Sequence, residues 1–460
     1  MKTLFITAFN PFISRNILNS DVLRELKKGE LRIVIFALPD KVNFLEKYYG
    51  GPNVIFEGVD LEDLIRSSTS RFWHRLAFLI ENTQYVRDQR KEQLEKNKTF
   101  AGYLNYFWIS LVSEILSRLP FIPRLYRHLD FKYVRRGVLQ EQYQQYQPSL
   151  LFSTDIFGEY DIVFMRDARQ NGVPIIGMVR SWDNPTTKGI VRLMPDQIIV
   201  NGKIAKEELH RIHGASWDTI SVVGLPQFDQ WLSGPTISRE DFFSGIGADS
   251  SKRLILFAPA GSILSDTDWQ TAEIIKKAMD AKKLPSDLQI LVRNHPHHPA
   301  DFSKFSGDNR FIFEIPGQKI AALTERQAEL SPDDNSHLRN SVYYSDLVMY
   351  VATSLGLDSC VYDKPQILIS FDGWEQRPYI RSVRRYNQED CLGNLVKTGG
   401  TAVAYSEQQL LHYMNEYLEN PKKDHEGRQR IIETQMHILD GQAGKRCAEI
   451  ILTMLQSAHA

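Results

Sequence analysis

Short apolar runs recur along the chain at intervals that leave room for a helix between consecutive runs. In the first half of the sequence these runs cover residues 3–9, 32–38, 149–154, 174–179, 197–202 and 220–224. Strands that alternate with helical stretches are typical of parallel pairing through right-handed crossovers. The pattern therefore predicts an α/β fold with a parallel sheet in this half of the chain.

A second series of apolar runs follows the polar, turn-rich stretch 232–253. Its runs cover residues 254–260, 289–295, 310–315, 346–352, 365–371 and 401–405. Two such series on either side of one linker predict two Rossmann-like domains. We expect an N-terminal domain at 1–235, a C-terminal domain at 236–440 and a final helix at 441–460.

Residues 60–147 interrupt the first series with a long helical stretch that is rich in aromatic residues and arginine. Between Arg118 and Arg136 there are six lysines or arginines and one acidic residue, Asp130. Basic and large apolar residues interleaved in this way suit an anionic acceptor or an anionic membrane surface, with peripheral contact through 104–136. The alternative is an amphipathic helical insertion that packs on the sheet and turns a solvated basic face to water.

The composition is that of a globular enzyme, with 42% of the 460 residues hydrophobic and 24% charged. A formal net charge of -1 gives no general attraction to nucleic acid, so local groups must hold any anionic ligand. The three cysteines lie far apart, which argues against a disulfide framework or a thiolate zinc site and favours a reducing cytosol.

The start of the chain lacks the features of a signal peptide, and no apolar run reaches the roughly 18 residues of a membrane-spanning helix. We therefore expect a cytoplasmic protein, located on the inner face of the membrane if the basic stretch binds lipid.

Ligands of open parallel α/β sheets lie beyond the carboxyl ends of the strands, so the residues after each apolar run are the candidates for chemistry. The first such stretch, 181–189, reads SWDNPTTKG. A carboxylate there can act as general base toward an acceptor hydroxyl, which makes Asp183 the catalytic candidate. Trp182, Asn184 and Lys188 are candidates for the acceptor side. The alternative for Asp183 is that it caps the turn that follows.

Two further stretches combine glycine with small or polar residues after a predicted strand. GLPQFDQW (224–231) is a tight turn that presents backbone amides, and it is a weak signal by itself. APAGSILSD (258–266) is a small-residue turn suited to close approach of a phosphate, with Gly261 and Ser262 as donor-binding candidates. The alternative for the second stretch is an ordinary loop.

The stretch RNHPHHP (293–299) follows another predicted strand. Pro296 directs His295 off the strand end, and Arg293 adds a cation beside it. A histidine there can donate a hydrogen bond to a phosphoryl oxygen of a leaving nucleotide, so we predict catalytic and donor-binding roles for it. A metal site is disfavoured because the histidines lack the helical i, i+4 spacing and a carboxylate in register.

The stretch YVATSLGLDSCVYDKP (350–365) holds a predicted strand end and an immediate helix start. Free amides at that helix start suit a phosphate beside Thr353 and Ser354. Asp358 follows one helical turn later on the same face, where a carboxylate can accept hydrogen bonds from ribose hydroxyls. The alternative is that Thr353 and Ser354 only cap the helix.

Taken in order, these stretches resemble the CDP-glycerol glycerophosphotransferases of teichoic-acid synthesis. That family carries a WHGTPLK-like turn, a GYPRND-like turn, a strand ending in APT, an LHP, and a TDYSSxxFD segment followed by DKP. The resemblance covers roughly residues 174–375, and bacterial surface-polysaccharide glycosyltransferases share the HP and Ser/Thr features. The segment 440–452, DGQAGKRCAEIIL, is similar to the end of GT-B families that include UDP-sugar 2-epimerase relatives.

The resemblance implies a GT-B architecture, in which two Rossmann-like domains face a cleft and a C-terminal helix crosses back to the first domain. It implies that the N-terminal domain takes the acceptor and the C-terminal domain a nucleotide-activated donor, without an obligatory metal or another cofactor. It places His295 and Ser354 at the donor phosphates and Asp358 at the ribose. Where the family has a histidine after tryptophan, this chain has Asp183, which leaves the acceptor and the transferred group open.

The sequence favours a glycosyltransferase of polysaccharide biosynthesis that moves a sugar to a hydroxyl of a cell-surface glycan or lipid-linked acceptor. Three alternatives stay open: a CDP-glycerol glycerophosphotransferase, a UDP-sugar 2-epimerase-like isomerase, and a catalytically silent binding protein on the same scaffold.

Overall fold

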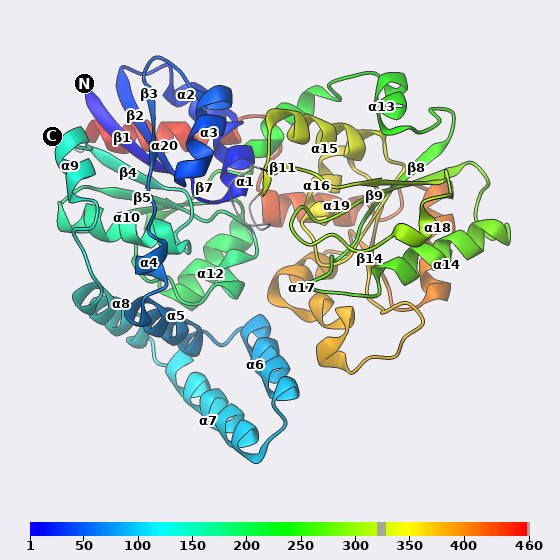
Figure 1. The fold of residues 1–460 in the computed structure, drawn as a ribbon, viewed down its shortest axis with the longest axis horizontal. Helices are drawn as coiled ribbons and strands as arrows, with labels where there is room; N and C mark the ends of the chain where they lie inside the picture. The colour runs from blue at the N-terminus through cyan, green and yellow to red at the C-terminus, as the bar shows by residue number, and fades with distance from the viewer. Residues whose placement is uncertain (320–327, 458–460) are drawn as a thin grey trace. The chain divides into compact units, whose positions relative to one another are not determined.

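A computed structural model describes residues 1–319 and 328–457 of the chain, which folds into two compact units (Figure 1). Among the described residues, unit 1 comprises Met1–Gln230 and the chain from Thr434 onward. Unit 2 comprises the residues between, from Trp231 to Glu433. Residues 320–327 and 458–460, which fall in the expected C-terminal domain and final helix, lie outside the described residues.

Unit 1 contains a seven-stranded parallel sheet in the order β3-β2-β1-β4-β5-β6-β7. The strands are β1 (Lys2–Thr7), β2 (Leu31–Ala37), β3 (Val54–Gly58), β4 (Leu150–Ser153), β5 (Ile175–Met178), β6 (Gln197–Val200) and β7 (Ile220–Val222). All but β3 coincide with the predicted apolar runs. The sequence pattern missed β3 because it is an edge strand whose side chains are half-buried or exposed.

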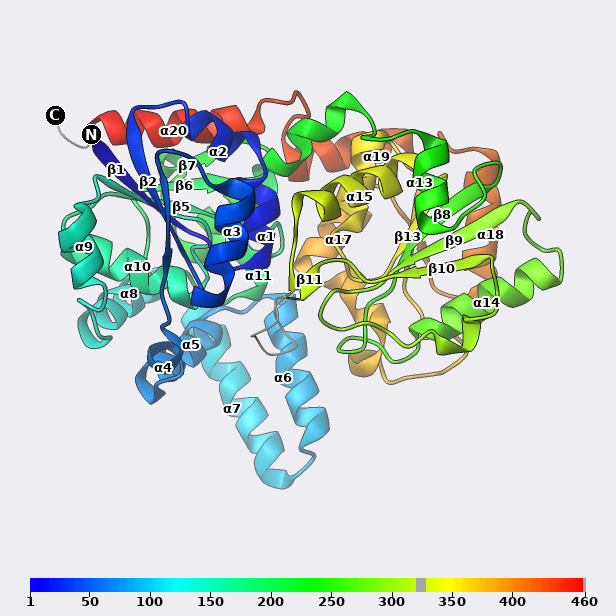
Figure 2. The ribbon, with the colours of Figure 1, turned by 45° about the horizontal axis from the view of Figure 1, so that its top comes forward.

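Helices cover both faces of this sheet, and each face has its own apolar core. One core includes side chains of α2 (Asp21–Leu26), α3 (Val42–Tyr49) and α20 (Ala443–Ser457), and the other includes those of α10 (Glu159–Gln170) and α12 (Lys203–His213). Both layers are visible in Figure 2. The remaining helices of the sheet domain are the short α1 (Pro11–Ile13) and α11 (Asn184–Thr187).

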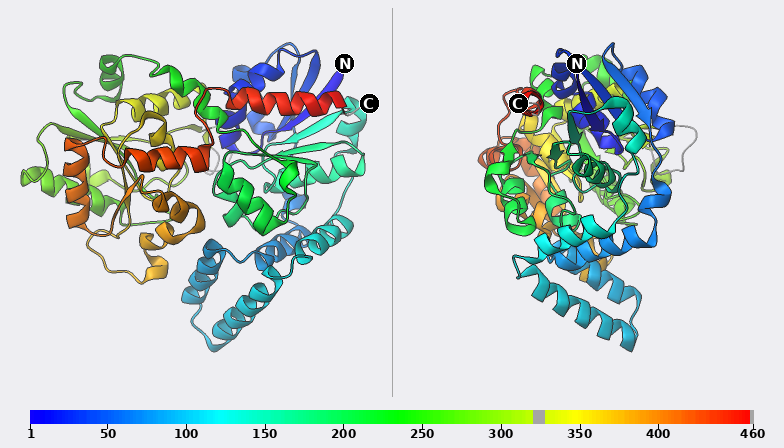
Figure 3. Two further views of the ribbon diagram at one scale, coloured as in Figure 1. Left: turned by 180° about the vertical axis from the view of Figure 1, so that it is seen from behind. Right: turned by 90° about the vertical axis from the view of Figure 1, so that its left-hand side faces the viewer.

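The C-terminal helix α20 packs on α2 within unit 1 (Figure 3). The approach is close at Gly444, where an added Cβ would lie 2.8 Å from the Cβ of Asp21. The carboxylate of Asp229 accepts the backbone N–H groups of Ala443 and Gly444 at 3.1 and 2.7 Å, which caps the start of α20. The GLPQFDQW stretch thus secures the returning helix through its aspartate.

The predicted helical stretch 60–147 lies between β3 and β4. It forms α4 (Glu62–Ile65), α5 (Ser68–Ile80), α6 (Gln84–Lys96), α7 (Phe100–Ser117), α8 (Ile122–Tyr133) and α9 (Gln140–Tyr146). Side chains of α5 and α8 form a small core of their own around Trp73 and Tyr126. Helices α6 and α7 run as a pair that extends away from the sheet of unit 1 (Figures 1 and 2).

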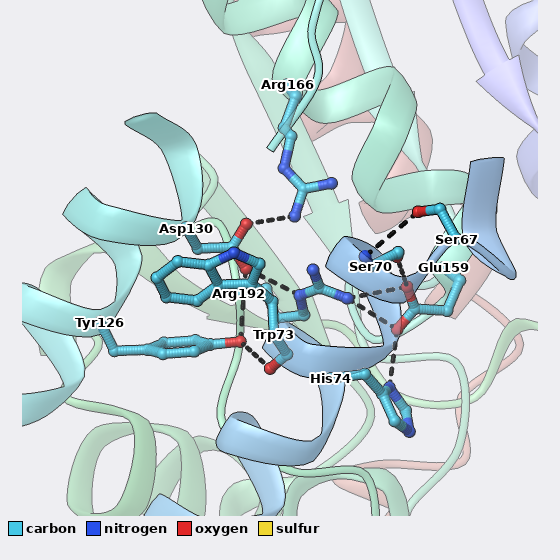
Figure 4. Close-up of polar contacts among 9 residues, drawn as sticks. All are labelled: Ser67, Ser70, Trp73, His74, Tyr126, Asp130, Glu159, Arg166 and Arg192. Carbon is cyan, nitrogen blue, oxygen red and sulfur yellow. Dashed lines mark hydrogen bonds and ion pairs between the residues drawn. The ribbon is translucent and has the colours of Figure 1, made fainter. Parts of the chain in front are cut away.

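A buried ion-pair network attaches α5 and α8 to the sheet domain (Figure 4). Asp130 of α8 is fully buried and pairs with Arg166 of α10 and with Arg192, whose Nε lies 2.8 Å from the carboxylate. Arg192 also reaches Glu159 at 2.8 Å, and Glu159 contacts Nδ1 of His74 on α5 at 2.8 Å. Each buried charge therefore has an opposite charge beside it.

Unit 2 contains a six-stranded parallel sheet in the order β10-β9-β8-β13-β14-β15. Its strands are β8 (Arg253–Ala258), β9 (Leu288–Arg293), β10 (Phe311–Glu314), β13 (Leu347–Tyr350), β14 (Gln366–Ile369) and β15 (Ala402–Ala404), and each coincides with a predicted run. A short antiparallel pair, β11 (Gln318–Lys319) and β12 (Ala328–Glu329), was not predicted.

The helices of unit 2 precede the first of these strands, connect the strands, or follow the last one. They are α13 (Arg239–Ile246), α14 (Asp268–Asp280), α15 (Pro332–Tyr344), α16 (Leu355–Asp358), α17 (Asp390–Lys397), α18 (Glu407–Glu419) and α19 (His425–Ile431). Both predicted series of strands thus form the expected parallel sheets.

Replacing Asp130 with asparagine should destabilise the protein by about 3–5 kcal/mol, because two arginines would keep their buried charges without the carboxylate. Denaturant unfolding followed by circular dichroism measures this change. The control is Glu92→Gln, which removes an exposed ion pair with Lys96 and should change the free energy of unfolding by less than about 0.5 kcal/mol. Equal stability of the two variants would show that the network does not hold α8.

Candidate functional site

Three neighbouring strands of unit 2, β9, β8 and β13, end at the same edge of the sheet. The loops after β8 and β9 are in direct contact, since the N–H of Ser262 donates to the carbonyl of His298 at 3.0 Å. Gly261 has φ +83°, and a Cβ there would lie 2.4 Å from the same carbonyl. Only glycine fits this position, so the close approach that the sequence predicted for Gly261 is made by the histidine loop.

The imidazole of His295 is held in one orientation by its own loop. Its Nδ1 accepts the backbone N–H groups of His297 and His298 at 3.1 and 3.2 Å. Burial, assisted by the two neighbouring imidazoles, lowers the pKa of His295 to about 4. The ring is therefore neutral near pH 7, and its proton is on Nε2 because Nδ1 accepts hydrogen bonds. The free atom of the ring is a hydrogen-bond donor.

Arg293 lies within an ion-pair network. Its Nη1 lies 2.5 Å from Glu314, and the other oxygen of Glu314 lies 2.6 Å from Nε2 of His337. Burial raises the pKa of the Glu314 carboxyl, but His337 and Arg293 outweigh it and hold that pKa below its usual value. The charge of Arg293 is thus largely compensated, and its side chain is only 10% exposed.

The backbone amides after β8 already have protein partners. The N–H of Gly261 donates to Asp268 at 2.9 Å, and that of Ser262 donates to His298. Burial raises the pKa of Asp268 to about 6. A phosphate at this turn would therefore meet the exposed hydroxyl of Ser262 instead of these two amides.

After β13, the predicted residues divide into exposed and buried groups. The hydroxyl of Thr353 accepts the N–H of Leu355 at 3.3 Å, while Ser354, at the position before α16, makes no side-chain capping hydrogen bond. Ser354 is exposed, and its hydroxyl donates to Asp358 at 3.5 Å. Asp358 is only 2% exposed, so the structure supports a role in orienting Ser354 better than a direct contact with ribose.

In unit 1, the segment 181–189 follows β5 and forms the single helical turn α11. Asp183 occupies the position before this turn, but its carboxylate makes no capping hydrogen bond there. The carboxylate instead accepts the hydroxyl groups of Ser181 and Thr187. Asp183 is partly exposed and lies after a strand end, as a general base would require.

The three acceptor-side candidates differ in exposure. Lys188 is exposed, whereas Trp182 and Asn184 are buried. Both polar atoms of the Asn184 side chain lack a hydrogen-bond partner among the residues that the structure describes. Of the three, only Lys188 is openly accessible.

His213, the last residue of α12, was not among the residues that the sequence patterns selected. Its Nδ1 accepts the N–H of Val191 at 3.2 Å, and its Nε2 donates to the carbonyl of Pro185 at 2.8 Å. Burial lowers the pKa of this imidazole to about 4. A neutral histidine thus joins both ends of the loop that follows Asp183.

A second group that the prediction missed lies at the ends of β1 and β4. Asp161 is buried and accepts hydrogen bonds from Thr7 and Ser153. Burial, and then the charge of Asp155, raises its pKa to about 7. Asp155 pairs with Arg180 at 2.7 Å. Asp155 directly follows a predicted strand, so the rule that selected Asp183 could also have selected it.

No group of three or more histidine, cysteine, aspartate or glutamate side chains within 1–319 and 328–457 is arranged to hold a metal ion. No helix in those same ranges is long and apolar enough to cross a membrane.

No family model and no curated protein sequence matches the chain. Solved structures resemble it over its whole length. A putative UDP-N-acetylglucosamine 2-epimerase from Listeria monocytogenes has a TM-score of 0.57 at 13% identity, covering 99% of this chain and 98% of that one. The UDP-GlcNAc 2-epimerase from Neisseria meningitidis, bound to UDP-GlcNAc, has a TM-score of 0.53 at 10% identity, covering 98% and 100%.

The wall teichoic acid polymerase TagF has a TM-score of 0.51 at 12% identity, covering 100% of this chain and 90% of that one. At sequence identities of 10% to 13%, these similarities show a shared fold and nothing more specific. The chain has the GT-B fold, which confirms the fold that the sequence resemblance implied.

The buried, neutral His213 makes stability depend on pH. Between its ordinary pKa of 6.5 and its folded value of about 4, the unfolded chain binds a proton that the folded chain does not. The stabilisation is therefore complete above 6.5, and up to about 3 kcal/mol is lost as the pH falls through this window, at about 1.4 kcal/mol per pKa unit.

Denaturant unfolding at several pH values measures this loss. His213→Gln keeps a donor and an acceptor but cannot titrate, so its stability should fall less steeply between about pH 6.5 and pH 4. Identical slopes for the variant and the natural protein would contradict the assignment.

Proposed function

We propose that the protein is a metal-independent glycosyltransferase that moves a sugar from a nucleotide-activated donor to an acceptor hydroxyl. The observation that carries the proposal is His295. Its ring is neutral, its Nδ1 is occupied by backbone N–H groups, and its Nε2 is left as a donor at a strand end. Such a donor suits the oxygen of a leaving phosphate, where negative charge develops in the transition state.

In this proposal unit 2 binds the donor nucleotide. Ser354 and Ser262 supply exposed hydroxyl groups on the loops that follow β13 and β8, and β8 lies next to β9, the strand that ends before His295. Thr353 orders the start of α16, and Asp358 orients Ser354. Gly261 allows the loop after β8 to approach the histidine loop, and Arg293 holds the end of β9 through Glu314.

Unit 1 binds the acceptor, and Asp183 acts as its general base. The carboxylate removes the hydroxyl proton, the oxygen attacks the anomeric carbon, and the bond from that carbon to the nucleotide phosphate breaks. The nucleotide leaves with the bonding electrons, and the N–H of His295 stabilises its new charge. The hydroxyl groups of Ser181 and Thr187 orient the Asp183 carboxylate, and exposed Lys188 is an accessible contact for an acceptor.

The acceptor that we propose is a cell-surface glycan or lipid-linked molecule on the cytoplasmic side, with membrane contact through residues 104–136. The structural neighbours are enzymes, and one of them was solved with UDP-GlcNAc, which supports a nucleotide-sugar as the donor. The same comparison favours a second candidate function, epimerisation of a UDP-sugar. The structural similarity to TagF supports a third candidate function, that of a CDP-glycerol glycerophosphotransferase.

Replacing His295 with alanine should lower turnover about 100-fold or more, as expected for the loss of a donor to developing charge. His298→Ala is the matched control, because its ring stacks on that of His295 at 5.4 Å and its backbone carbonyl is retained. Because the pKa of His295 is about 4, this contribution should not change with pH above about 5.5. Equal turnover of both variants would remove His295 from the site.

Replacing Asp183 with asparagine should lower transfer by about 100-fold to 10,000-fold, the range for loss of a general base, while donor affinity is kept. Calorimetry with UDP, CDP, GDP and CMP measures the affinity, and product formation measures the transfer. The control is Asp218→Asn, which changes an exposed carboxylate elsewhere in unit 1.

The same assay distinguishes the candidate functions. Conversion of UDP-GlcNAc without any acceptor would establish the epimerase, and turnover of CDP-glycerol alone among donors would establish the glycerophosphotransferase. Binding of a nucleotide without turnover of any donor would leave a binding protein.

A further inference from the structure

The face of α7 that points away from its neighbours is apolar along the whole helix. Phe100 is 80% exposed and Trp108 is 60% exposed. The exposed large apolar residues of the helix are Phe100, Tyr103, Leu104, Phe107, Trp108, Leu111 and Ile115. Their spacings of three and four residues place them in one stripe on the helix surface.

The opposite face of α7 packs on the protein, and this packing leaves the stripe on the exposed side of the helix. Ser113 is fully buried, and its hydroxyl donates to the backbone carbonyl of Glu81 at 3.4 Å. Helix α7 packs against α5 and α6. Its one charged residue, Glu114, accepts from Asn82 at 2.5 Å and pairs with Arg118. Ser113 and the Asn82 contact of Glu114 thus lie on the side of α7 that packs on the protein, and the large apolar side chains of the stripe lie on the exposed side.

The stripe is too large to be an ordinary surface feature. Helix α7 has 18 residues, which corresponds to a length of about 27 Å. Its four exposed aromatic side chains alone present on the order of 500 Å² of surface. Monomeric soluble proteins rarely leave a continuous apolar patch of this size without a binding partner.

Exposed basic residues follow α7 in the chain, on α8 and in the segment after it. Arg124, Arg135 and Arg136 are exposed, and within the described part of the chain no carboxylate lies at ion-pair distance from them. The one acidic residue of this stretch, Asp130, is buried between two arginines. The exposed face of α7 is therefore apolar. Arg124, Arg135 and Arg136 make no ion pair within the described residues, although Asp60, Glu62 and Asp63 line the same pocket as Arg135 and Arg136.

The combination of exposed aromatic side chains and unpaired arginines is complementary to an anionic bilayer surface, where aromatic rings lie at the head-group level and arginines bind lipid phosphates. A second copy of the chain fits less well. A two-fold contact through this face would bring the same basic flanks together, and like charges repel. A membrane-spanning role is excluded for the described helices.

We propose that α7 lies in the plane of an anionic membrane, with its aromatic stripe in the head-group region and Arg124, Arg135 and Arg136 on lipid phosphates. The role of this docking rests on the proposed function, because membrane binding would bring unit 1 to a lipid-linked acceptor. The docking itself needs neither donor nor acceptor, so it can be tested separately.

Vesicle co-sedimentation of the full-length protein tests the docking. The protein should bind vesicles of phosphatidylcholine with about a third phosphatidylglycerol and bind pure phosphatidylcholine much more weakly. The double variant Phe107→Ser/Trp108→Ser should bind the anionic vesicles at least about tenfold more weakly. Arg135→Gln/Arg136→Gln should lose about fivefold per residue.

The matched control is Trp217→Ser, which removes a tryptophan of similar exposure, 47%, elsewhere in unit 1. It should bind vesicles as the natural protein does. Circular dichroism and thermal unfolding should show that all variants remain folded, because each change is at an exposed side chain.

Three results would overturn the docking proposal. One is equal binding to neutral and anionic vesicles, and another is unchanged binding of Phe107→Ser/Trp108→Ser. The third is a dimer that forms with increasing protein concentration in sedimentation experiments and is lost in this double variant, while neither the natural protein nor any variant binds vesicles. Transfer to a water-soluble acceptor should be unchanged in this double variant. If the natural protein binds anionic vesicles but transfers from no donor, the proposed function is contradicted and the docking proposal stands.

Discussion

The buried carboxylate of Asp130 and the two arginines around it determine where the helical insertion lies on unit 1. A buried charge that loses its partner destabilises a protein by several kcal/mol. A shift of α8 would separate Asp130 from Arg166 and Arg192, and Arg192 would keep only its ion pair with Glu159. The contact of His74 with Glu159 ties α5 to the same network. Because α7 packs on α5, the direction of its apolar face follows from these ion pairs.

A second constraint comes from the parallel sheets, which gather the ends of distant strands at one edge. The apolar pattern predicted nearly all of these strands, and it therefore predicted which loops gather there. It could not predict how each side chain is used. Arg293 was expected to be a cation for the donor, but Glu314, 21 residues later, compensates its charge. Gly261 was expected to let a phosphate approach the turn after β8, but its backbone N–H donates to Asp268.

The parts of the site that the sequence did not reveal depend on contacts between residues far apart in the chain. Asp161 accepts from Thr7, 154 residues away, and Asp229 caps a helix that begins more than 200 residues later. His213 stands at the end of an ordinary amphipathic helix and carries no local motif. Burial and long-range partners decide the protonation of such groups, and a single sequence shows neither. The edge strand β3 was missed for a related reason, because its partial exposure weakens the apolar signal.

Charge is used differently in the two places where we propose that ligands bind. At the strand ends of unit 2, His295 is neutral and Arg293 is compensated, so recognition there depends on directed hydrogen bonds more than on net charge. On α8 and after it, Arg124, Arg135 and Arg136 make no ion pair within the described residues, although the whole chain carries a formal net charge of only -1. Their field extends over a Debye length of about 8 Å at physiological salt. In the proposed docking, these arginines would attract an anionic surface most strongly when it meets this face, so the charges would favour the same orientation of unit 1 as the aromatic stripe.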